Sequence, residues 1–261
     1  MILPEQLRPW VEGKPYTCDQ IGKSGSAVLC YGDMVLKIEP KQARFASDVA
    51  MLRWLEGRLH VPKVLCALQD GERQYLLMTR MPGKMACDRE LMKDPESLVQ
   101  LLAHALQTLW AVDISDCPRA RTLEDDLREA RERVEQNLID LDDVEPETFG
   151  PGGFESPAAL LAWLEENKPP VEPVLSHGDF CLPNVFFEEG QLSGFIDLGD
   201  CGISDRWRDI ALCHRSLRHN FCGKYAACPM PDFDPDLLFD KLGIDPDWEK
   251  LRYYVLLDEL F

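Results

Sequence analysis

Two aspartates and one asparagine in the last third of the chain have the types and spacing needed to hold a metal ion and to move a proton. Asp179 follows His177-Gly178, Asn184 lies five residues further on, and Asp197 comes thirteen residues after that. Carboxylate and amide oxygens are the hard ligands that Mg²⁺ takes in proteins. A carboxylate that is not bound to the metal can accept the proton of a hydroxyl group. The three side chains therefore predict a site that combines a divalent cation with a general base.

A predicted hairpin positions two of these side chains. One strand is expected from Asn184 to Glu188 and the other from Leu192 to Asp197, with a turn at Glu189-Gly190. Because a tight hairpin brings its two ends together, we expect Asn184 and Asp197 to be neighbours. Each segment alone is compatible with an ordinary turn or strand end. Together they form the pattern H-x-D-x₄-N … D-x-G, which is typical of the catalytic and metal loops of kinase-fold enzymes.

A lysine in an apolar strand and a glycine-rich segment are candidate phosphate contacts near the N-terminus. Lys37 stands in the predicted strand 34–38, which pairs with strand 27–31 around Gly32-Asp33. Its ammonium group needs an anion there, and a nucleotide phosphate is one candidate. The alternative is a lysine at the edge of an ordinary amphipathic strand. The segment Gly22-Lys23-Ser24-Gly25-Ser26 can offer backbone N–H groups to phosphates, although it is neither a Walker A motif nor a full G-x-G-x-x-G motif.

The order of the predicted elements divides the chain into two lobes. Residues 1–84 contain two hairpins, the second at 64–79, and one helix at about 48–56. In residues 85–261, helices are expected after the capping signals Asp94-Pro95, Thr122 and Ser156-Pro157, and again at 204–218, 236–242 and 247–260. This order predicts an α+β, bilobal fold, with a β-rich N-terminal nucleotide-binding lobe and a larger α-helical C-terminal lobe for catalysis and substrate binding. A cleft between two lobes is a favoured ligand site.

The charge and the cysteines limit the possible partners. The chain of 261 residues has 46 Asp and Glu against 28 Lys and Arg, a formal net charge of −18. This charge disfavours nucleic acid and anionic membranes as partners, and it is compatible either with a cationic ligand or with solubility alone. No apolar run is long enough for a membrane span, and the N-terminus lacks a signal peptide's apolar core, so we expect a cytoplasmic location. Ten scattered cysteines without a C-x-x-C pair predict free thiols.

Nearly the whole chain resembles the aminoglycoside 3′-phosphotransferases, or kanamycin kinases. The matching segments are 54–57, 61–65, 113–118, 176–184, 193–199 and 253–261. The resemblance implies a protein-kinase-like fold and transfer of the γ-phosphoryl group of ATP or GTP to the 3′-hydroxyl of an aminoglycoside such as kanamycin or neomycin. It also implies Mg²⁺ as cofactor and antibiotic resistance as the biological outcome.

The same resemblance implies roles for individual residues by matching position. By this resemblance, Asp179 matches the position of the family's catalytic aspartate, and Asn184 and Asp197 match the positions of its Mg²⁺ ligands. Candidate nucleotide contacts are Lys37, Ser24 and the hinge residues Thr79, Arg80 and Met81, whose backbone meets adenine. Candidate substrate contacts are Asp258, Glu259 and the C-terminal carboxylate of Phe261. From the residues alone, the end of an amphipathic helix is the favoured interpretation of that last segment.

Two positions depart from the family's pattern beside the expected site. The usual partner of the lysine is a glutamate, and ungapped counting places Asp48 there, so we expect a longer or water-mediated pair between Lys37 and Asp48. Asp200 stands where the family usually has arginine. This change reverses the charge beside the metal and the drug, so we count Asp200 among the candidate substrate contacts and leave the substrate range open.

Other functions remain possible on the sequence alone. The first alternative is a kinase of another cationic or hydroxylated metabolite, which the aspartate at position 200 motivates. A nucleotide-binding module without catalysis is disfavoured, because a degenerate kinase usually lacks one of the four residues Lys37, Asp179, Asn184 and Asp197. A protein kinase is disfavoured because no activation segment with an A-P-E ending is recognisable. The choice between monomer and dimer is not resolved by the sequence.

Overall fold

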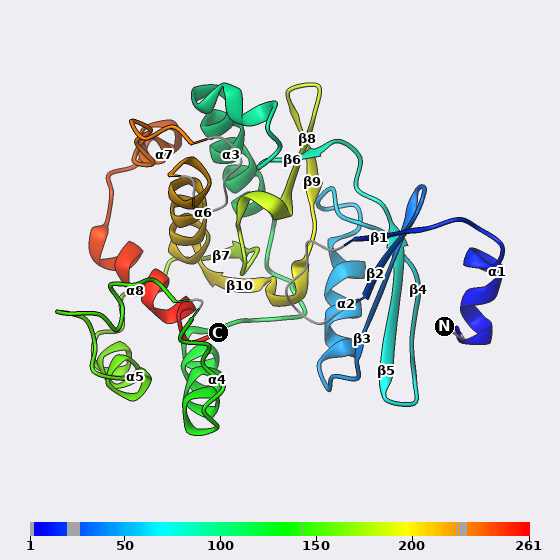
Figure 1. Cartoon of the computed structure of the whole chain (residues 1–261), viewed down its shortest axis with the longest axis horizontal. Coiled ribbons are helices and arrows are strands. Elements are labelled where there is room, and N and C mark those ends of the chain that lie inside the picture. The colour runs from blue at the N-terminus through cyan, green and yellow to red at the C-terminus, as the bar shows by residue number, and fades with distance from the viewer. Residues whose placement is uncertain (1–2, 20–26, 143, 223, 225–228) are drawn as a thin grey trace.

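The computed structural model describes residues 3–19, 27–142, 144–222, 224 and 229–261. A β-sheet with one packed helix forms the N-terminal part, and a mainly helical region forms the rest, joined side by side (Figure 1). This arrangement confirms the predicted α+β architecture. The division into domains at residue 84 stays a prediction, since the short strand that begins at Lys84 already pairs with the helical region.

The N-terminal sheet is antiparallel and has five strands in the order β1-β2-β3-β5-β4. Its strands are β1 (Thr17–Asp19), β2 (Ala27–Tyr31), β3 (Met34–Pro40), β4 (Val64–Asp70) and β5 (Arg73–Thr79). Both predicted hairpins are present, and Gly32 and Gly71 at their turns have positive φ angles. Helix α2 (Phe45–Leu55) lies on the side of the sheet that faces the helical region (Figure 1).

The helical region contains the longer helices α3 (Pro95–Trp110), α4 (Leu123–Glu135), α5 (Pro157–Glu166), α6 (Arg206–Phe221), α7 (Leu237–Leu242) and α8 (Trp248–Asp258). The predicted caps are formed: the side chains of Asp94, Thr122 and Ser156 each accept a hydrogen bond from the first turn of the helix that follows. Two small sheets accompany these helices, β6 (Lys84–Met85) with β8 (Val185–Glu188) and β9 (Gln191–Phe195), and β7 (Pro173–Ser176) with β10 (Gly202–Asp205).

The sequence analysis did not predict several short elements. They are the single-turn segments η1 (Glu5–Leu7), α1 (Arg8–Val11), η2 (Leu91–Lys93), η3 (Leu182–Asn184) and η4 (Leu198–Asp200), and the strands β1, β6, β7 and β10. The β7–β10 pair joins segments that lie far apart in the chain, with Leu175 opposite Ile203. A pairing of this kind leaves no local signal in the sequence, whereas a hairpin does.

The main hydrophobic core lies in the helical region and extends into the N-terminal part of the chain. It includes Leu102 and Leu106 of α3 and Phe195 at the end of β9, and it also includes Met51 and Leu55 of α2. A second, smaller core lies within the N-terminal sheet and α1. Helix α2 is therefore buried against the helical region as well as against its own sheet, which ties the two parts together.

The structure bears on two further features of the described residues, membrane-spanning helices and disulfide bonds. No helix there has the length and apolarity needed to cross a bilayer. The nine cysteines within that part form no disulfide bonds with one another.

Candidate active site

The candidate base Asp179 lies in the loop after β7, directly behind a glycine with a left-handed backbone. Gly178 has a φ of +86°, which glycine adopts without strain. A Cβ atom at this position would lie 2.4 Å from the main-chain oxygen of Asp200. The resulting turn lets the N–H of Asp179 donate to Nδ1 of His177 (3.3 Å), while its carboxylate accepts from Nδ2 of Asn184 (2.9 Å). Glycine at position 178 thus allows the loop to reach the site.

The β8–β9 hairpin brings Asn184 and Asp197 together. Val185 pairs with Phe195, and the N–H of Ile196 donates to the main-chain oxygen of Asn184 (2.9 Å). Asn184 ends the short turn η3 rather than opening a strand, and Asp197 follows β9 with a left-handed φ of +59°. Both side chains therefore leave the hairpin at the same end, as the spacing predicts.

A buried histidine links the two loops. Because the N–H of Asp179 can only donate, Nδ1 of His177 accepts and Nε2 carries the proton, which it donates to the main-chain oxygen of Ile196 (2.9 Å). Burial lowers the pKa of His177, so the ring is neutral. His177 thereby holds the loop of Asp179 against the segment that carries Asp197.

The surroundings of Asp179 make it a stronger proton acceptor than an aspartate in water. The residue is exposed where it lines a cavity, while its chain neighbours Gly178 and Phe180 are buried. Burial raises the pKa of its carboxyl to about 6, and the negative charges of Asp258 and Asp197 act in the same direction. A general base works best when its pKa approaches the working pH.

A carboxylate on α6 supports the catalytic loop from behind. Asp209 is fully buried and accepts hydrogen bonds from Oγ of Ser176 (3.0 Å) and from the N–H groups of His177 (2.9 Å) and Gly178 (3.1 Å). The adjacent Arg208 donates to the main-chain oxygen of Gly178 (3.1 Å). The sequence analysis missed both residues. The local pattern carries little signal, because Arg208 and Asp209 stand in the mostly charged run Asp205–Asp209 at the start of a helix.

The chemistry of Asn184 and Asp197 suits Mg²⁺. Asn184 uses its amide nitrogen for hydrogen bonds to Asp179 and to Sγ of Cys181, which leaves the amide oxygen for a cation. The side chain of Asp197 is 55% exposed. Among the described residues, no cluster of three or more His, Cys, Asp or Glu side chains is placed to hold a metal. A cation here would depend on these two oxygen donors and on substrate phosphates, as Mg²⁺ commonly does.

Lys37 reaches the same place from the N-terminal sheet. Its Nζ lies 3.0 Å from Oδ1 of Asp197 and 3.2 Å from Oε1 of Glu39. Burial lowers the pKa of Lys37, but the two carboxylates outweigh burial and raise it overall. The ammonium group is therefore charged and stands beside a candidate metal ligand, where it could contact a phosphate.

The expected pair between Lys37 and Asp48 is wrong. Asp48 lies in the first turn of α2, and its Oδ1 binds Nη1 of Arg119 (2.6 Å) while Oδ2 lies 3.6 Å from Nε of Arg44. Arg119 belongs to the segment between α3 and α4, so counting residues in the N-terminal part could not have identified it. Asp48 therefore binds Arg119 and so links the N-terminal part to the helical region, and its partners are arginines rather than Lys37.

The predicted hinge follows β5. The N–H of Thr79 donates to the main-chain oxygen of Lys63 (3.0 Å), and that of Arg80 donates to Asp33 (2.7 Å). The N–H of Met81 is left as the candidate donor to a base. Ser24, the other predicted nucleotide contact, lies outside the described residues.

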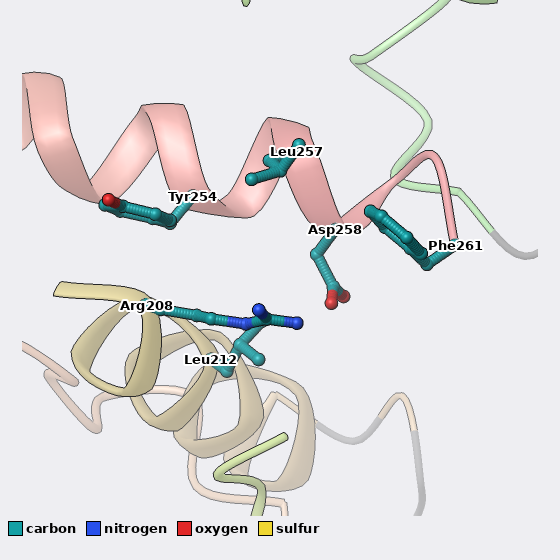
Figure 2. Close-up of a pocket in the computed structure, with 6 residues that line it drawn as sticks. All are labelled: Arg208, Leu212, Tyr254, Leu257, Asp258 and Phe261. Carbon is teal, nitrogen blue, oxygen red and sulfur yellow. The ribbon is translucent and has the colours of Figure 1, made fainter. Parts of the chain in front are cut away.

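A cavity of about 750 Å³ lies beside Asp179, between the start of α2 and the helices α4, α6 and α8. Asp258 and Phe261 line one end of it. Figure 2 shows the carboxylate of Asp258 close to the guanidinium of Arg208, with the ring of Phe261 beside it. A volume of this order is typical of sites for small molecules.

Two predicted substrate contacts differ in their surroundings. Arg215 binds the carboxylates of both Asp258 and Glu259. Asp258 still faces the cavity, but Glu259 is buried and its second oxygen accepts from the N–H of Glu145 (2.6 Å). A direct contact from Glu259 to a ligand therefore stays a prediction that this geometry does not favour.

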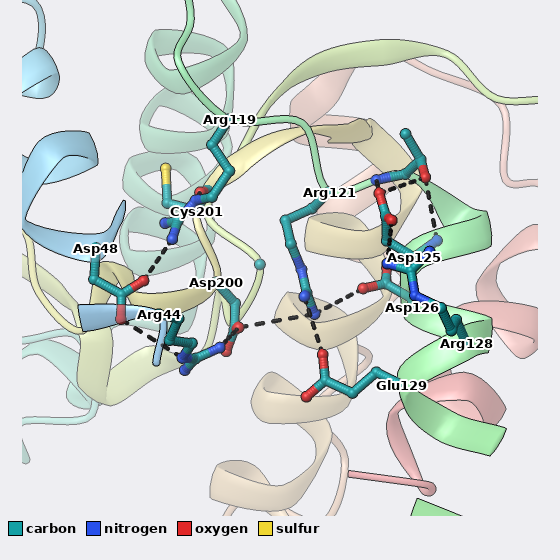
Figure 3. A network of polar contacts seen from close by, with 12 residues as sticks. Arg44, Asp48, Arg119, Arg121, Asp125, Asp126, Arg128, Glu129, Asp200 and Cys201 are labelled. Atoms are coloured by element: carbon teal, nitrogen blue, oxygen red, sulfur yellow. Dashed lines mark hydrogen bonds and ion pairs between the residues drawn. The ribbon is translucent and has the colours of Figure 1, made fainter. Parts of the chain in front are cut away.

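Asp200 lines the cavity, but arginines pair its charge (Figure 3). Its Oδ1 lies 2.7 Å from Nη1 of Arg44 and 3.8 Å from Nη2 of Arg121. Burial raises the pKa of Asp200, but the arginines, led by Arg44, outweigh it and lower the pKa overall. Arg121 also binds Asp126 (2.8 Å) and Glu129 (3.0 Å). The charge reversal at position 200 is thus balanced within the protein.

The close approach at Gly178 gives a direct test of the catalytic loop. Gly178→Ala should lower the free energy of unfolding by about 1–3 kcal/mol more than Gly190→Ala. Both positions have positive φ, which costs ~1–2 kcal/mol for other residues, but a Cβ at Gly190 has nothing within 4 Å. Urea denaturation measures this difference, and kcat should fall only for Gly178→Ala. Equal effects of the two changes would contradict the proposed loop geometry.

Comparisons with known proteins identify relatives of the whole chain. A model of a phosphotransferase enzyme family matches residues 22–254. An aminoglycoside 3′-phosphotransferase of Enterococcus faecalis is 40% identical over 81% of this chain and 76% of its own length. Another, from Niallia circulans, is 35% identical over 99% of this chain and 97% of its own length.

Solved structures with the same architecture include enzymes of this kind. The crystal structure of an aminoglycoside 3′-phosphotransferase of type VIII has a TM-score of 0.82 and 27% identity, and the match covers 98% of this chain and 97% of that one. An aminoglycoside phosphotransferase of Streptomyces rimosus, solved with ADP and streptomycin, has a TM-score of 0.76 and 23% identity, with 97% and 95% covered. At 23% identity, the similarity to the Streptomyces rimosus enzyme shows only that the two proteins share a fold.

Proposed function

The chain belongs to the phosphotransferase enzyme family, and from that premise we propose that it is an aminoglycoside 3′-phosphotransferase. It transfers the γ-phosphoryl group of ATP or GTP to the 3′-hydroxyl of drugs such as kanamycin or neomycin, and so confers resistance on its host. The observation that carries this proposal is that Asp179 and Asp258 line one cavity. A hydroxyl group can lie at the base while an ammonium group of the same ligand lies at the second carboxylate.

Each residue of the site has a part in the transfer. Asp179 orients the hydroxyl and accepts its proton as the oxygen bonds to the γ-phosphorus and the bond to the β,γ-bridging oxygen breaks. Lys37 balances phosphate charge from β3. Asn184 and Asp197 would hold Mg²⁺, which when bound neutralises charge on the phosphates. The main-chain groups from Thr79 to Met81 would meet the base.

A panel of acceptors tests the function directly. Kanamycin and neomycin should each support Mg²⁺-dependent consumption of ATP or GTP, because both carry a 3′-hydroxyl. Analogues without this hydroxyl should bind as competitive inhibitors and support no turnover. A coupled kinase assay measures both, and expression in a susceptible bacterium should raise the inhibitory concentration of the same drugs. Absence of turnover with every 3′-hydroxyl drug would contradict the proposal.

A second candidate function is a kinase of another cationic or hydroxylated metabolite. In the wall formed by Arg44, Asp200 and Arg121, the carboxylate is paired with arginines. Because this wall attracts ammonium groups less than an unpaired carboxylate would, it favours the hydroxylated members of this class over the cationic ones. A metabolite screen that finds phosphorylation, together with no activity on the drug panel, would select this alternative.

A further inference from the structure

The loop that carries Asp197 is held from the N-terminal part of the chain at three points. Lys37 binds the carboxylate of Asp197 (3.0 Å). Arg44 binds that of Asp200 (2.7 Å). Between them, Asp48 binds Arg119 (2.6 Å), which in turn holds the main chain of the loop. Four of the five residues 197–201, all except Gly199, thus receive a contact from Lys37, Arg44 or Arg119.

Arg119 uses each of its three guanidinium nitrogens in this arrangement. Nε donates to the main-chain oxygen of Cys201 (2.6 Å), Nη2 donates to that of Leu198 (3.2 Å), and Nη1 binds Asp48. The side chain is only 11% exposed. Figure 3 shows the guanidinium between the loop and α2. A planar group with donors in a fixed fork is suited to this geometry, and a lysine cannot reproduce it.

The backbone around Arg119 is itself fixed. The N–H of Ile203 donates to the main-chain oxygen of Arg119 (3.0 Å), and the N–H of Arg121 donates back to Ile203 (2.9 Å). The segment 119–121 therefore runs along β10, directly after the loop. On the other side, α2 is anchored because Met51 and Leu55 are buried in the main core. Arg119 therefore links the segment beside β10, which is held by main-chain hydrogen bonds, to α2, which is held by its buried side chains.

We propose that Arg119 is a positioning residue for the metal-binding loop, and that Asp48 and Arg44 fix this loop to α2. Arg119 binds two carbonyls of the loop, those of Leu198 and Cys201, and the first of these also accepts the N–H of Cys201 within the turn. Asp197, in a left-handed conformation directly before the turn, is thereby kept at the orientation needed to share a cation with Asn184. The inference rests on the metal-dependent nucleotide binding of the proposed function.

Support of this kind commonly changes metal affinity strongly. Replacing residues that orient metal ligands typically costs about 10–100-fold in affinity. The contacts of Arg119 lie on the nucleotide side of the site, whereas Asp258 and Phe261 line the other end of the cavity. Loss of Arg119 should therefore weaken Mg²⁺–ATP binding and leave the Michaelis constant for the aminoglycoside unchanged.

The test compares Arg119→Lys with Arg128→Lys, which changes an exposed arginine that pairs with Asp125 on α4. Calorimetry without aminoglycoside should show that Arg119→Lys raises the Mg²⁺ concentration for half-maximal ATP binding about 10–100-fold. ATP binding in EDTA should be unchanged. Hydrogen exchange of the ligand-free protein should be about 10-fold faster at the amide of Cys201, while the strands β2 and β3 exchange at the normal rate. Arg128→Lys should alter none of these.

Asp48→Asn keeps the loop contacts of Arg119 and weakens the links of Arg119 and Arg44 to α2, because a neutral amide oxygen replaces the carboxylate. It should shift the Mg²⁺ requirement in the same direction by a smaller factor, and the double change Asp48→Asn/Arg119→Lys should be less than additive. The inference is overturned if Arg119→Lys and Arg128→Lys behave alike, or if Arg119→Lys raises the Michaelis constant for the drug instead. These binding and exchange measurements need no acceptor, so a failure of the drug assignment is distinguishable from a failure of the positioning role.

Discussion

Replacing Asp179 with asparagine should reduce kcat by about 10²–10⁴-fold, the usual contribution of a general base. The asparagine side chain has nearly the same size, and its oxygen can still accept from Nδ2 of Asn184 (2.9 Å in the native protein), so the loop should keep its shape. What is lost is the carboxylate whose pKa burial and the neighbouring Asp258 and Asp197 raise to about 6. Steady-state kinetics with saturating ATP and kanamycin measure the change.

Two further measurements make the Asp179 result specific. The dissociation constant of Mg²⁺–ATP should stay near the native value, because Lys37, Asn184 and Asp197 are untouched. The matched control is Asp240→Asn, which removes one negative charge from an exposed position on α7 and should leave kcat unchanged. A near-native kcat for Asp179→Asn would rule out Asp179 as the base.

Replacing Asp209 with alanine should destabilise the protein by about 3–5 kcal/mol. Three donors lose this acceptor: Oγ of Ser176 and the N–H groups of His177 and Gly178. Gly178 alone keeps a second acceptor, Oγ of Ser176 (3.1 Å). Each buried donor left without a partner costs about 1–3 kcal/mol. Thermal unfolding should then occur about 10 °C lower, at ~2–4 °C for each kcal/mol.

The same change should also lower activity at temperatures where the protein remains folded. His177 and Gly178 precede Asp179 directly, so freeing their N–H groups loosens the loop that presents the base. Asp240→Ala is the matched control and should shift the unfolding temperature by no more than the ordinary effect of a surface change. If Asp209→Ala unfolds at the control's temperature, the buried acceptor is not what holds the catalytic loop.

Local signals identified most of the framework. The turns at Gly32 and Gly71, and the caps at Asp94, Thr122 and Ser156, depend on residues within four positions of one another, so the sequence pattern contains the whole interaction. The same holds for the contact between Asn184 and Ile196, because a single hairpin joins them. The candidate base and the metal ligands could therefore be named from residue type and spacing alone.

Long-range partners could not be named in this way. Asp48 matched a family position by counting, yet its partner is Arg119, 71 residues along the chain. Asp200 was identified as a reversed charge, but nothing in its vicinity predicted that Arg44, 156 residues away, would neutralise it. Asp209 had no motif at all. Each case depends on which charged groups the packing brings within a few ångströms, and many alternative pairings have the same sequence signal.

The sequence by itself determined the chemistry of the site: which side chains can take a proton, hold a cation or bind phosphate, and that a hairpin must bring two of them together. Only the tertiary structure decided how these groups are held and how their charges are balanced. The reason is physical. Chemical type and local turns are properties of a short segment, whereas ion pairs such as Asp48–Arg119 and Arg44–Asp200 form only after α2 has packed against the helical region.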